Sequence, residues 1–406
     1  MKKKKIKLKK FLKKKIIIKK IIINKKKKMQ KKKRNPKFSS STPPILLTQN
    51  KIPSSKEQGF TGKSTEWFSD KEFYSNLQGK SDIYHEKDYY FNSYSTFYIH
   101  EEMLKDKIRT GSYEKAILNN KEIFKNKIVL DIGSGTGILS IFACFAGAEH
   151  VYAIEYADIA DYSKEIIKKN NLENKITVFK EKVENVELPC EKVDIIISEW
   201  MGYFLLYESM LDTVLFARDK WLKNNGFILP DRAKIYLCGF EDKNYKFSKI
   251  NSWDNIFDFD FSFLKGTAIS EPLIDVCNKN NVISNCKKVF DIDLYNVKKE
   301  DLDFSSGYEI EFLRNDTFNC LVFWFDVVFS KLPNQVVLKT GPFDEPTHWK
   351  QTIFYIEDDV KVEKGEKLKG CICAVKDKWN FRFIDVKISY HFEKEKGDYV
   401  YYYKIT

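Results

Sequence analysis

The chain has little of what marks metal-binding, secreted or membrane proteins. It has 5 histidines and 8 scattered cysteines among 406 residues, and no cysteine has the histidine spacing of a zinc site. Scattered cysteines without such spacing are typical of reduced thiols in an intracellular protein. The longest apolar runs near the amino terminus, residues 16–18 and 21–23, are too short for a membrane span or a signal peptide. We therefore expect no metal site, no membrane span and a location in the nucleus and cytoplasm.

Acidic residues are absent from residues 1–34, although this segment holds 20 of the 70 Lys and Arg residues. The rest of the chain has 50 basic and 57 acidic residues, so the net charge of +13 divides into a basic tail and a body of net charge −7. An acidic body attracts cationic ligands and repels phosphate backbones. Basic peptides are therefore expected substrates, and nucleic-acid binding is expected through the tail only.

The chain divides into three regions by sequence pattern. Residues 1–79 are rich first in Lys and Ile and then in Ser and Pro, which predicts a disordered tail. In residues 80–230, short apolar strands alternate with helical stretches, a pattern typical of a doubly wound parallel sheet. Residues 231–406 change to strands of period two, which predicts an antiparallel β-barrel or sandwich. Within them, residues 245–263 are crowded with aromatic side chains that lack a clean periodicity and must be buried somewhere.

A glycine-rich turn follows the first expected strand of the parallel sheet. Gly133, Gly135 and Gly137 permit positive φ angles and a close approach of a ligand to the backbone. Asp131, just before the turn, would repel a pyrophosphate but favours a cationic ligand, so the turn indicates S-adenosylmethionine over NAD. Glu155 ends the next strand, 24 residues after Asp131, where a carboxylate can accept hydrogen bonds from ribose hydroxyls.

Two acids, Glu199 and Glu208, follow a buried strand and lie among bulky apolar residues. Carboxylates in apolar surroundings need a cationic partner. An alternative is that Glu208 caps a helix that starts near Ser209. A cap would explain one acid but not both, so the pair indicates a site for a cation.

These motifs resemble those of the protein arginine methyltransferase family. The segments Glu199-Trp-Met-Gly-Tyr and Glu208-Ser-Met are similar to its double-E loop, and Tyr90-Phe-Asn-Ser-Tyr94, Ile99-His-Glu-Glu-Met103 and Thr347-His-Trp349 recur in the family's order. The resemblance covers about residues 89–406 and is closest to the type I branch, which forms asymmetric dimethylarginine. It implies an α/β Rossmann-like domain that binds S-adenosylmethionine, followed by an antiparallel β-barrel with an inserted dimerisation arm at about residues 242–272.

The resemblance also implies roles for single residues. Glu199 and Glu208 would grip the guanidinium of a substrate arginine through charge-assisted hydrogen bonds and direct one nitrogen toward the methyl donor. His348 and Asp106 would form a pair that either relays a proton or holds the amino-terminal helices over the cofactor. Arg109 would meet the cofactor carboxylate, and Glu184 the adenine amino group. The cofactor site would contain Tyr94, His100, Met103, Arg109, Asp131, Gly133, Gly135, Gly137, Glu155 and Glu184, and the substrate pocket Tyr90, Met103, Met210 and Trp349.

The expected reaction is methyl transfer from S-adenosylmethionine, leaving S-adenosylhomocysteine, to arginines in histone tails and Arg/Gly-rich proteins. The expected enzyme is a homodimer or higher oligomer. A methyltransferase acting on small molecules or nucleic-acid bases would also keep the glycine turn, but it would not need paired acids. A silent scaffold with an RNA-binding tail would be indicated by degraded acids or a broken turn, and here both motifs are intact.

Overall fold

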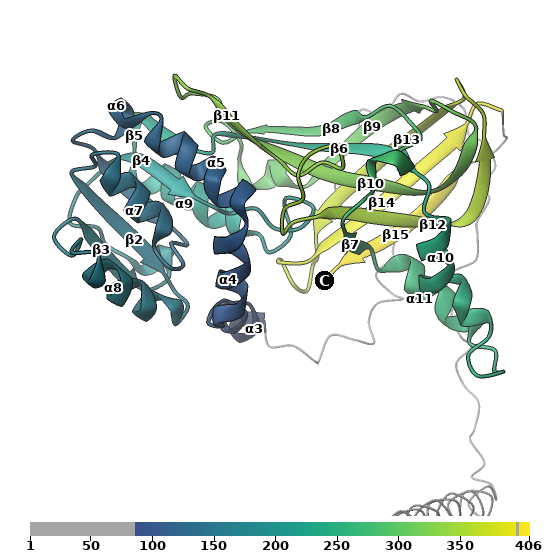
Figure 1. Ribbon diagram of the computed structural model, residues 1–406, viewed down its shortest axis with the longest axis horizontal. Helices are drawn as coiled ribbons and strands as arrows, with labels where there is room; N and C mark the ends of the chain where they lie inside the picture. Colours follow the sequence, from purple (N-terminus) through teal and green to yellow (C-terminus); the bar gives the residue numbers. More distant parts are fainter. Residues whose placement is uncertain (1–85, 395–397) are drawn as a thin grey trace, which may run out of the picture. The chain divides into compact units, whose positions relative to one another are not determined.

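The computed structural model describes residues 86–394 and 398–406. The tail predicted over residues 1–79 lies outside these residues. In the described part of the chain, no helix is long and apolar enough to cross a bilayer, and no three potential metal ligands gather at one place. A parallel sheet is followed along the chain by two antiparallel sheets (Figure 1).

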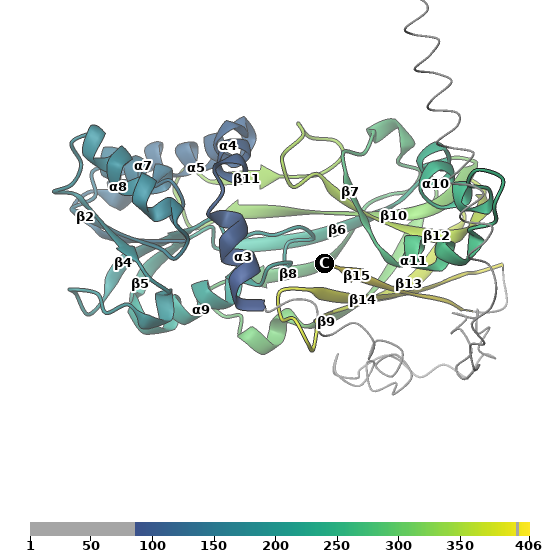
Figure 2. The same cartoon turned by 90° about the horizontal axis from the view of Figure 1, so that it is seen from below.

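The first sheet is parallel, with the strand order β3-β2-β1-β4-β5. Helices cover both of its faces, with α7 and α8 on one side and α9 on the other (Figure 2). The order reverses at β1, between β2 and β4, and open α/β sheets bind ligands at the carboxyl ends of the strands at such a point. The strands are β1 (Ile128–Ile132), β2 (His150–Glu155), β3 (Ile176–Lys180), β4 (Val193–Ser198) and β5 (Leu222–Leu229), and the helices are α7 (Ile138–Phe145), α8 (Ile159–Lys169) and α9 (Met210–Trp221).

Four described helices precede the parallel sheet. Asp106 lies between the second and third of them and caps the third, because its side chain accepts hydrogen bonds from the backbone N–H groups of Ile108 and Arg109 at 3.0 and 2.9 Å. The first of them, α3, lies between the parallel sheet and the antiparallel strands (Figure 2). The helices are α3 (Glu86–Tyr94), α4 (Phe97–Lys105), α5 (Lys107–Leu118) and α6 (Lys121–Phe124).

The antiparallel half consists of two sheets, in agreement with the predicted fold class. One has the order β7-β12-β10-β6-β8, with β11 paired to β10, and the other has the order β15-β14-β13-β9. Phe318 contacts the rings of Phe312, Tyr390 and Phe392, so side chains from both sheets share an aromatic core. The strands are β6 (Arg232–Phe240), β7 (Leu273–Asp275), β8 (Lys287–Asp293), β9 (Phe304–Glu311), β10 (Asp316–Phe329), β11 (Val336–Lys339), β12 (Gln351–Val362), β13 (Lys367–Lys376), β14 (Ile384–Phe392) and β15 (Tyr399–Ile405).

Residues 241–272, the arm, connect β6 to β7 and contain α10 (Lys243–Lys249) and α11 (Lys265–Ser270) (Figure 1). Its root is anchored by Lys246, whose buried ammonium donates to a backbone carbonyl at 2.8 Å and to Asp359 at 2.9 Å. A buried cation requires such partners, so the root is fixed. The predicted burial of the arm's aromatic side chains does not occur within the single chain, where several of them are exposed: Phe247, Phe257, Phe259, Phe261 and Phe263.

Candidate active site

The glycine turn connects β1 to α7 at the carboxyl edge of the parallel sheet. Gly133, Gly135 and Gly137 have φ angles of 68°, 54° and 85°, in the left-handed region that favours glycine. A Cβ on Gly133 would lie 2.8 Å from Cε of Met210, and one on Gly137 would lie 2.6 Å from Oγ of Ser163. The turn therefore needs glycine both for its conformation and for the close approach of its neighbours.

Asp131, at the end of β1, is fully buried. Its Oδ2 accepts a hydrogen bond from Ser140 at 2.6 Å, whereas Oδ1 has no hydrogen-bond partner within the described part of the chain. Burial raises the pKa of Asp131 to about 7, although the hydrogen bond from Ser140 opposes this shift. An unsatisfied buried oxygen can accept a donor from a ligand, and a positive charge nearby would compensate the carboxylate. The residues of the turn therefore fit S-adenosylmethionine.

Glu155 ends β2 and holds the glycine turn. Its Oε2 accepts a hydrogen bond from the backbone N–H of Gly135 at 2.9 Å, and its Oε1 accepts one from Ala157 at 2.8 Å. Burial raises the pKa of Glu155, and the hydrogen bonds from the backbone oppose that shift. The predicted ribose contact would use the second lone pairs of the same two oxygens. Glu155 therefore shapes the turn in addition to its predicted contact with the cofactor.

His100 and Glu184 differ in how closely they approach the turn. His100 is buried, with Nε2 at 2.7 Å from the carbonyl oxygen of Tyr94. Its ring lies 3.2 Å from the position of a Cβ on Gly135, so α4 lies against the turn. Burial lowers the pKa of His100, which favours the neutral imidazole. Glu184 is exposed and accepts a hydrogen bond from Thr213 at 3.3 Å.

Glu199 and Glu208 lie in the loop that follows β4, called the acidic loop here (residues 199–209). The loop is tightly folded, because a Cβ on Gly202 would lie 1.9 Å from the carbonyl oxygen of Tyr207. Glu208 has a φ angle of 75°. Residues other than glycine keep this conformation only where surrounding contacts impose it. The position of Glu208 is therefore set by its neighbours in the fold.

Glu199 is paired with Arg109 of α5. Nη2 and Nε of Arg109 lie 2.7 and 2.9 Å from Oε2 of Glu199, and both side chains are 9% exposed. Nη1 of Arg109 donates to the carbonyl oxygen of Met103 at 3.3 Å. The structure therefore places Arg109, predicted to meet the cofactor carboxylate, against a predicted catalytic acid. A buried ion pair of this kind leaves an uncompensated charge when either member is removed.

Glu208 has a different environment. Its Oε2 accepts a hydrogen bond from the hydroxyl of Tyr94 at 2.7 Å. Burial raises the pKa of Glu208 to about 7, the hydrogen bond from Tyr94 and the charge of Arg382 oppose the shift, and the charge of Glu199 adds to it. The alternative that Glu208 caps α9 is wrong, because Ser209 is the N-cap residue and the carboxylate of Glu208 faces Tyr94.

His348 and Asp106 form the predicted pair. Nδ1 of His348 lies 2.8 Å from Oδ2 of Asp106, and the backbone N–H of His348 donates to the same oxygen at 2.9 Å. Burial alone would raise the pKa of Asp106, but the hydrogen bonds from His348 and from the backbone outweigh it and lower the pKa. Trp349 is buried, and its Nε1 donates to the carbonyl oxygen of Met201 at 2.8 Å. Trp349 therefore supports the acidic loop from the core.

The remaining predicted residues lie around the same edge of the sheet. Met210 begins α9 and lies against the glycine turn, and Met103 is half-buried on α4. The ring centres of Tyr90 and Tyr94 are 5.0 Å apart on α3. The guanidinium carbon of Arg382 lies 3.7 Å from the ring centre of Tyr90. Arg382 was not predicted from the sequence, because it belongs to no recognised motif and only the fold brings it to the site.

Comparison with known proteins identifies the family. A family model described as the arginine methyltransferase oligomerization subdomain matches residues 231–395, and one described as ribosomal protein L11 methyltransferase (PrmA) matches residues 115–214. Protein arginine N-methyltransferase 1 of Chlamydomonas reinhardtii is 51% identical over 310 residues, which are 76% of this chain and 90% of that protein. The chain belongs to the protein arginine N-methyltransferase family. The Schizosaccharomyces pombe relative of the same name is 50% identical over 306 residues, 75% of this chain and 90% of that protein.

Solved structures of arginine methyltransferases agree with this assignment. The Trypanosoma brucei PRMT1 enzyme-prozyme heterotetrameric complex with AdoHcy matches with a TM-score of 0.76 and 39% identity, over 77% of this chain and 100% of that chain. Arabidopsis thaliana protein arginine methyltransferase 10 matches with a TM-score of 0.71 and 29% identity, over 78% and 100%. The predicted family, fold class, S-adenosylmethionine dependence and type I arginine methyl transfer are confirmed. The roles of single residues, the domain boundaries and the location in the cell stay predictions.

Proposed function

We propose that this methyltransferase modifies arginines in histone tails and in Arg/Gly-rich proteins. The observation that carries the proposal is the pair of acids at the carboxyl edge of the parallel sheet, where Glu199 is held by an internal arginine and Glu208 by a tyrosine hydroxyl. A flexible basic segment can place one arginine between them, and the acidic body of the chain attracts such segments.

The glycine turn, Asp131 and Glu155 would hold the cofactor. When bound, S-adenosylmethionine supplies a methyl group on a positively charged sulfur. The orphaned oxygen of Asp131 offers an acceptor to a cationic group, and the glycines let Met210 and His100 approach the turn closely. Tyr94 and His100 join α3 and α4 to this edge through their mutual hydrogen bond at 2.7 Å.

Substrate arginine enters as a cation, because its pKa lies above about 12 and its lone pairs are delocalised over three nitrogens. Glu208, once ionised, attracts the positive charge to one side of the guanidinium and leaves one terminal nitrogen richer in electrons. Glu199 is already oriented by Arg109, and its Oε1 accepts the backbone N–H of Met201 at 3.2 Å. Positioning and electrostatics of this kind are sufficient to carry most of the rate of a direct transfer.

His348 and Asp106 hold the amino-terminal helices over the site. Oδ1 of Asp106 caps α5, and Oδ2 accepts two hydrogen bonds from His348, so the carboxylate joins two distant segments. His348→Ala should therefore lower thermal stability together with turnover. A lower turnover with unchanged stability would favour the alternative, proton relay by His348.

A homodimer or higher oligomer is supported by the exposed aromatic side chains of the arm and by the match of residues 231–395 to an oligomerization subdomain. Aromatic side chains of this kind are typical anchors of subunit interfaces. Deletion of residues 245–263 should give monomers that lose activity. Analytical ultracentrifugation measures the mass, and an unchanged mass would contradict the assignment of the arm.

A location in the nucleus and cytoplasm is supported by the basic tail, which also offers a surface for nucleic acid. Deletion of residues 1–79 should reduce nuclear enrichment or RNA retention and leave peptide methylation and thermal stability unchanged. A large loss of stability in the truncated protein would move the domain boundary toward the amino terminus.

The activity and its product are tested together by incubating the full chain with S-adenosylmethionine and an Arg/Gly-rich peptide. Mass spectrometry should show the addition of one and two methyl groups, and chromatography after acid hydrolysis should show asymmetric dimethylarginine. A peptide with lysine in place of every arginine is the matched control and should stay unmodified. Methylation of both peptides alike, or of neither, would contradict the proposal.

A further inference from the structure

The hairpin loop between β13 and β14, residues 377–383, reaches across to the acidic loop. The backbone N–H of Glu208 donates to the carbonyl oxygen of Arg382 at 2.8 Å, and Nη1 of Arg382 donates to the carbonyl oxygen of Glu208 at 2.7 Å. Arg382 therefore satisfies both backbone polar groups of Glu208. The next residue, Ser209, donates its hydroxyl to the carbonyl oxygen of Phe381.

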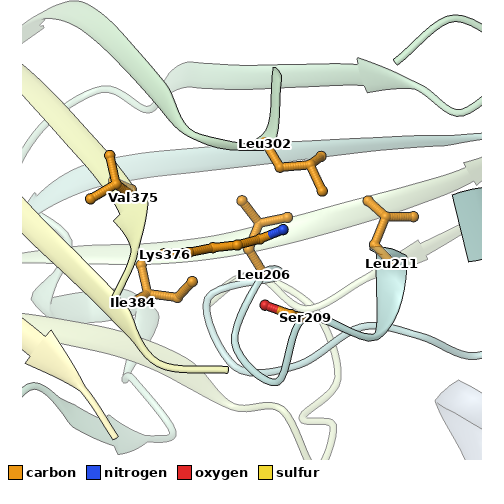
Figure 3. Close-up of a pocket in the computed structure, with 8 residues that line it drawn as sticks. Leu206, Ser209, Leu211, Leu302, Val375, Lys376 and Ile384 are labelled. Atoms are coloured by element: carbon orange, nitrogen blue, oxygen red, sulfur yellow. The ribbon is translucent and has the colours of Figure 1, made fainter. Parts of the chain in front are cut away.

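These hydrogen bonds, called the hairpin brace here, act on two residues whose backbone conformation is unfavourable. Glu208 and Ser209 have φ angles of 75° and 57°, a conformation that is unfavourable for residues other than glycine. The space between the acidic loop and strands β13 and β14 is also nearly filled, because the cavity there measures about 10 Å³, hardly the space of one water. Figure 3 shows Ser209 and Leu206 of the acidic loop facing Ile384 and Lys376 in this space.

Arg382 also connects Glu208 to helix α3. Its guanidinium carbon lies 3.7 Å from the ring centre of Tyr90 and 5.2 Å from that of Phe91, within the range of cation–π contacts. Tyr94 on the same helix donates to the carboxylate of Glu208. The guanidinium of Arg382 therefore contacts helix α3, which binds the side chain of Glu208 through Tyr94. It also donates to the backbone carbonyl oxygen of Glu208 itself.

The hairpin loop is itself held in place by the antiparallel half. Asp377 and Phe383 close it through a backbone hydrogen bond at 2.9 Å, and the side chain of Asp377 accepts the backbone N–H of Trp379 at 2.8 Å. Asp377 is also bonded to Lys404 of β15, which lies 3.0 Å from the buried Asp385. These contacts of Asp377 fix the conformation of the hairpin loop and therefore the position of Arg382.

We propose that Arg382 is a positioning residue for arginine methyl transfer, which fixes the backbone of Glu208 and joins it to α3. This inference rests on the proposed function. It means that the antiparallel half of the chain directly positions Glu208, the acid proposed to polarise the substrate guanidinium.

Arg382 acts on the charge of Glu208 as well as on its backbone. The titratable side chains that shift the pKa of Glu208 are Tyr94 and Tyr90 of α3, Glu199 of the acidic loop and Arg382 of the hairpin. Of these four, only Arg382 carries a positive charge and lowers the pKa of Glu208 by its charge. Its removal should raise the pH at which Glu208 ionises.

The test compares the full chain carrying Arg382→Ala, Arg382→Lys or Lys378→Ala with wild type. Lys378 is the matched control, because it is another cation of the same hairpin and its ammonium lies over Trp379 at 5.7 Å. Measured are turnover of an Arg/Gly-rich peptide as a function of pH, KM for S-adenosylmethionine, and binding of S-adenosylhomocysteine by calorimetry.

Arg382→Ala should lower kcat by about 10- to 100-fold and move the acid limb of its pH profile upward, because orientation and charge are both lost. Arg382→Lys keeps the charge but not the planar stack, so the acid limb should stay near that of wild type while kcat falls at every pH. Binding of S-adenosylhomocysteine should stay within about threefold in both variants, since Arg382 contacts Glu208, Tyr90 and Phe91, which were not assigned to the cofactor site. Lys378→Ala should behave as wild type.

An unchanged kcat and acid limb in Arg382→Ala would overturn the proposal, as would an equal loss in Lys378→Ala. If Arg382→Ala does not fold, Arg382→Lys decides, and wild-type kcat in that variant would overturn it. The proposed function fails separately, and the inference with it, if wild type binds S-adenosylhomocysteine but leaves the peptide unmethylated.

Discussion

The glycine turn and the acidic loop lie at the same edge of the parallel sheet but are built in different ways. In the turn, side chains and their hydrogen-bond partners are 9 and 20 residues apart in sequence. In the acidic loop, Glu199 and Glu208 have partners 90, 114 and 174 residues away, namely Arg109, Tyr94 and Arg382. The side-chain contacts that fix the turn and those that fix the acidic loop are therefore different, although Arg109 and Tyr94 were also assigned to the cofactor site. Substitutions in the turn and at Glu208 should accordingly affect cofactor binding and methyl transfer to different extents.

The largest effect is expected where a distant contact of the acidic loop is broken. Glu199→Gln leaves Arg109 buried without a counter-charge, so the free energy of unfolding should fall by about 3–5 kcal/mol and turnover should be lost. Denaturant titration and peptide methylation measure the two effects. Asp161→Asn is the control, because its ion pair with Lys180 is exposed to solvent and contributes little to stability. Equal losses of stability in the two variants would contradict the importance assigned to the buried pair.

A smaller effect is expected in the glycine turn. Gly135→Ala forces an alanine into a φ angle of 54° and places its Cβ 3.2 Å from the ring of His100. Stability should fall by about 1–2 kcal/mol, and binding of S-adenosylhomocysteine should weaken by about tenfold. Gly365→Ala is the matched control, since Gly365 has a φ angle of 84° with nothing within 4 Å of its Cβ position. Gly365→Ala should lose stability and keep its affinity for S-adenosylhomocysteine. Weaker cofactor binding in both variants would contradict the assignment of the effect to distortion of the glycine turn.

The pH dependence should distinguish the two regions further. The pKa values of Asp131 and Glu208 are both raised to about 7, so cofactor binding and turnover should both weaken as the pH falls below that value. Ser140→Ala removes a hydrogen bond that lowers the pKa of Asp131. The pH dependence of cofactor binding should therefore move upward, while the acid limb of kcat at saturating S-adenosylmethionine stays in place. If Ser140→Ala shifts the pH dependence of cofactor binding and the acid limb of kcat equally, the two regions do not act independently.

The same two carboxyls affect stability with the opposite sign. Their pKa values are higher in the folded chain than the unfolded values of about 4, so the folded chain binds protons more tightly. The contribution of these groups to the free energy of unfolding should therefore fall as the pH rises from about 4 to about 7.

The contrast between the two regions also explains what the sequence could predict. The alternation of short strands and helices within residues 80–230 and the glycine turn depend on local sequence pattern, and the structure has both. The identity of the acids could be predicted from a contiguous motif. The partners of these acids could not be predicted, because Arg109 and Arg382 reach the acidic loop through the packing of distant elements. Neither the ion pair of Arg109 with Glu199 nor the hydrogen bonds of Arg382 with Glu208 leave a periodic signal in the sequence.

The smallest effect is expected in product composition. Met103 and Met210 were assigned to the walls of the substrate pocket, and methionine is flexible enough to admit a monomethylated nitrogen a second time. Met103→Phe should slow the reaction and raise the share of monomethylated or symmetric product. Acid hydrolysis followed by chromatography separates the isomers. An unchanged product ratio would show that Met103 does not limit access to the target nitrogen.

The separation of cofactor binding from transfer is tested most directly by one paired measurement on Glu208→Gln. Calorimetric titration with S-adenosylhomocysteine and peptide turnover are measured on the same sample. Affinity should stay within about threefold of wild type, because a glutamine can still accept the hydrogen bond from Tyr94, while turnover falls by about 1,000-fold, because the negative charge that would act on the substrate is lost. Glu155→Gln should show the opposite pattern, with a loss of affinity for S-adenosylhomocysteine that is larger than its loss of turnover at saturating S-adenosylmethionine. Near-wild-type turnover in Glu208→Gln, or a loss of affinity as large as the loss of turnover, would contradict the account.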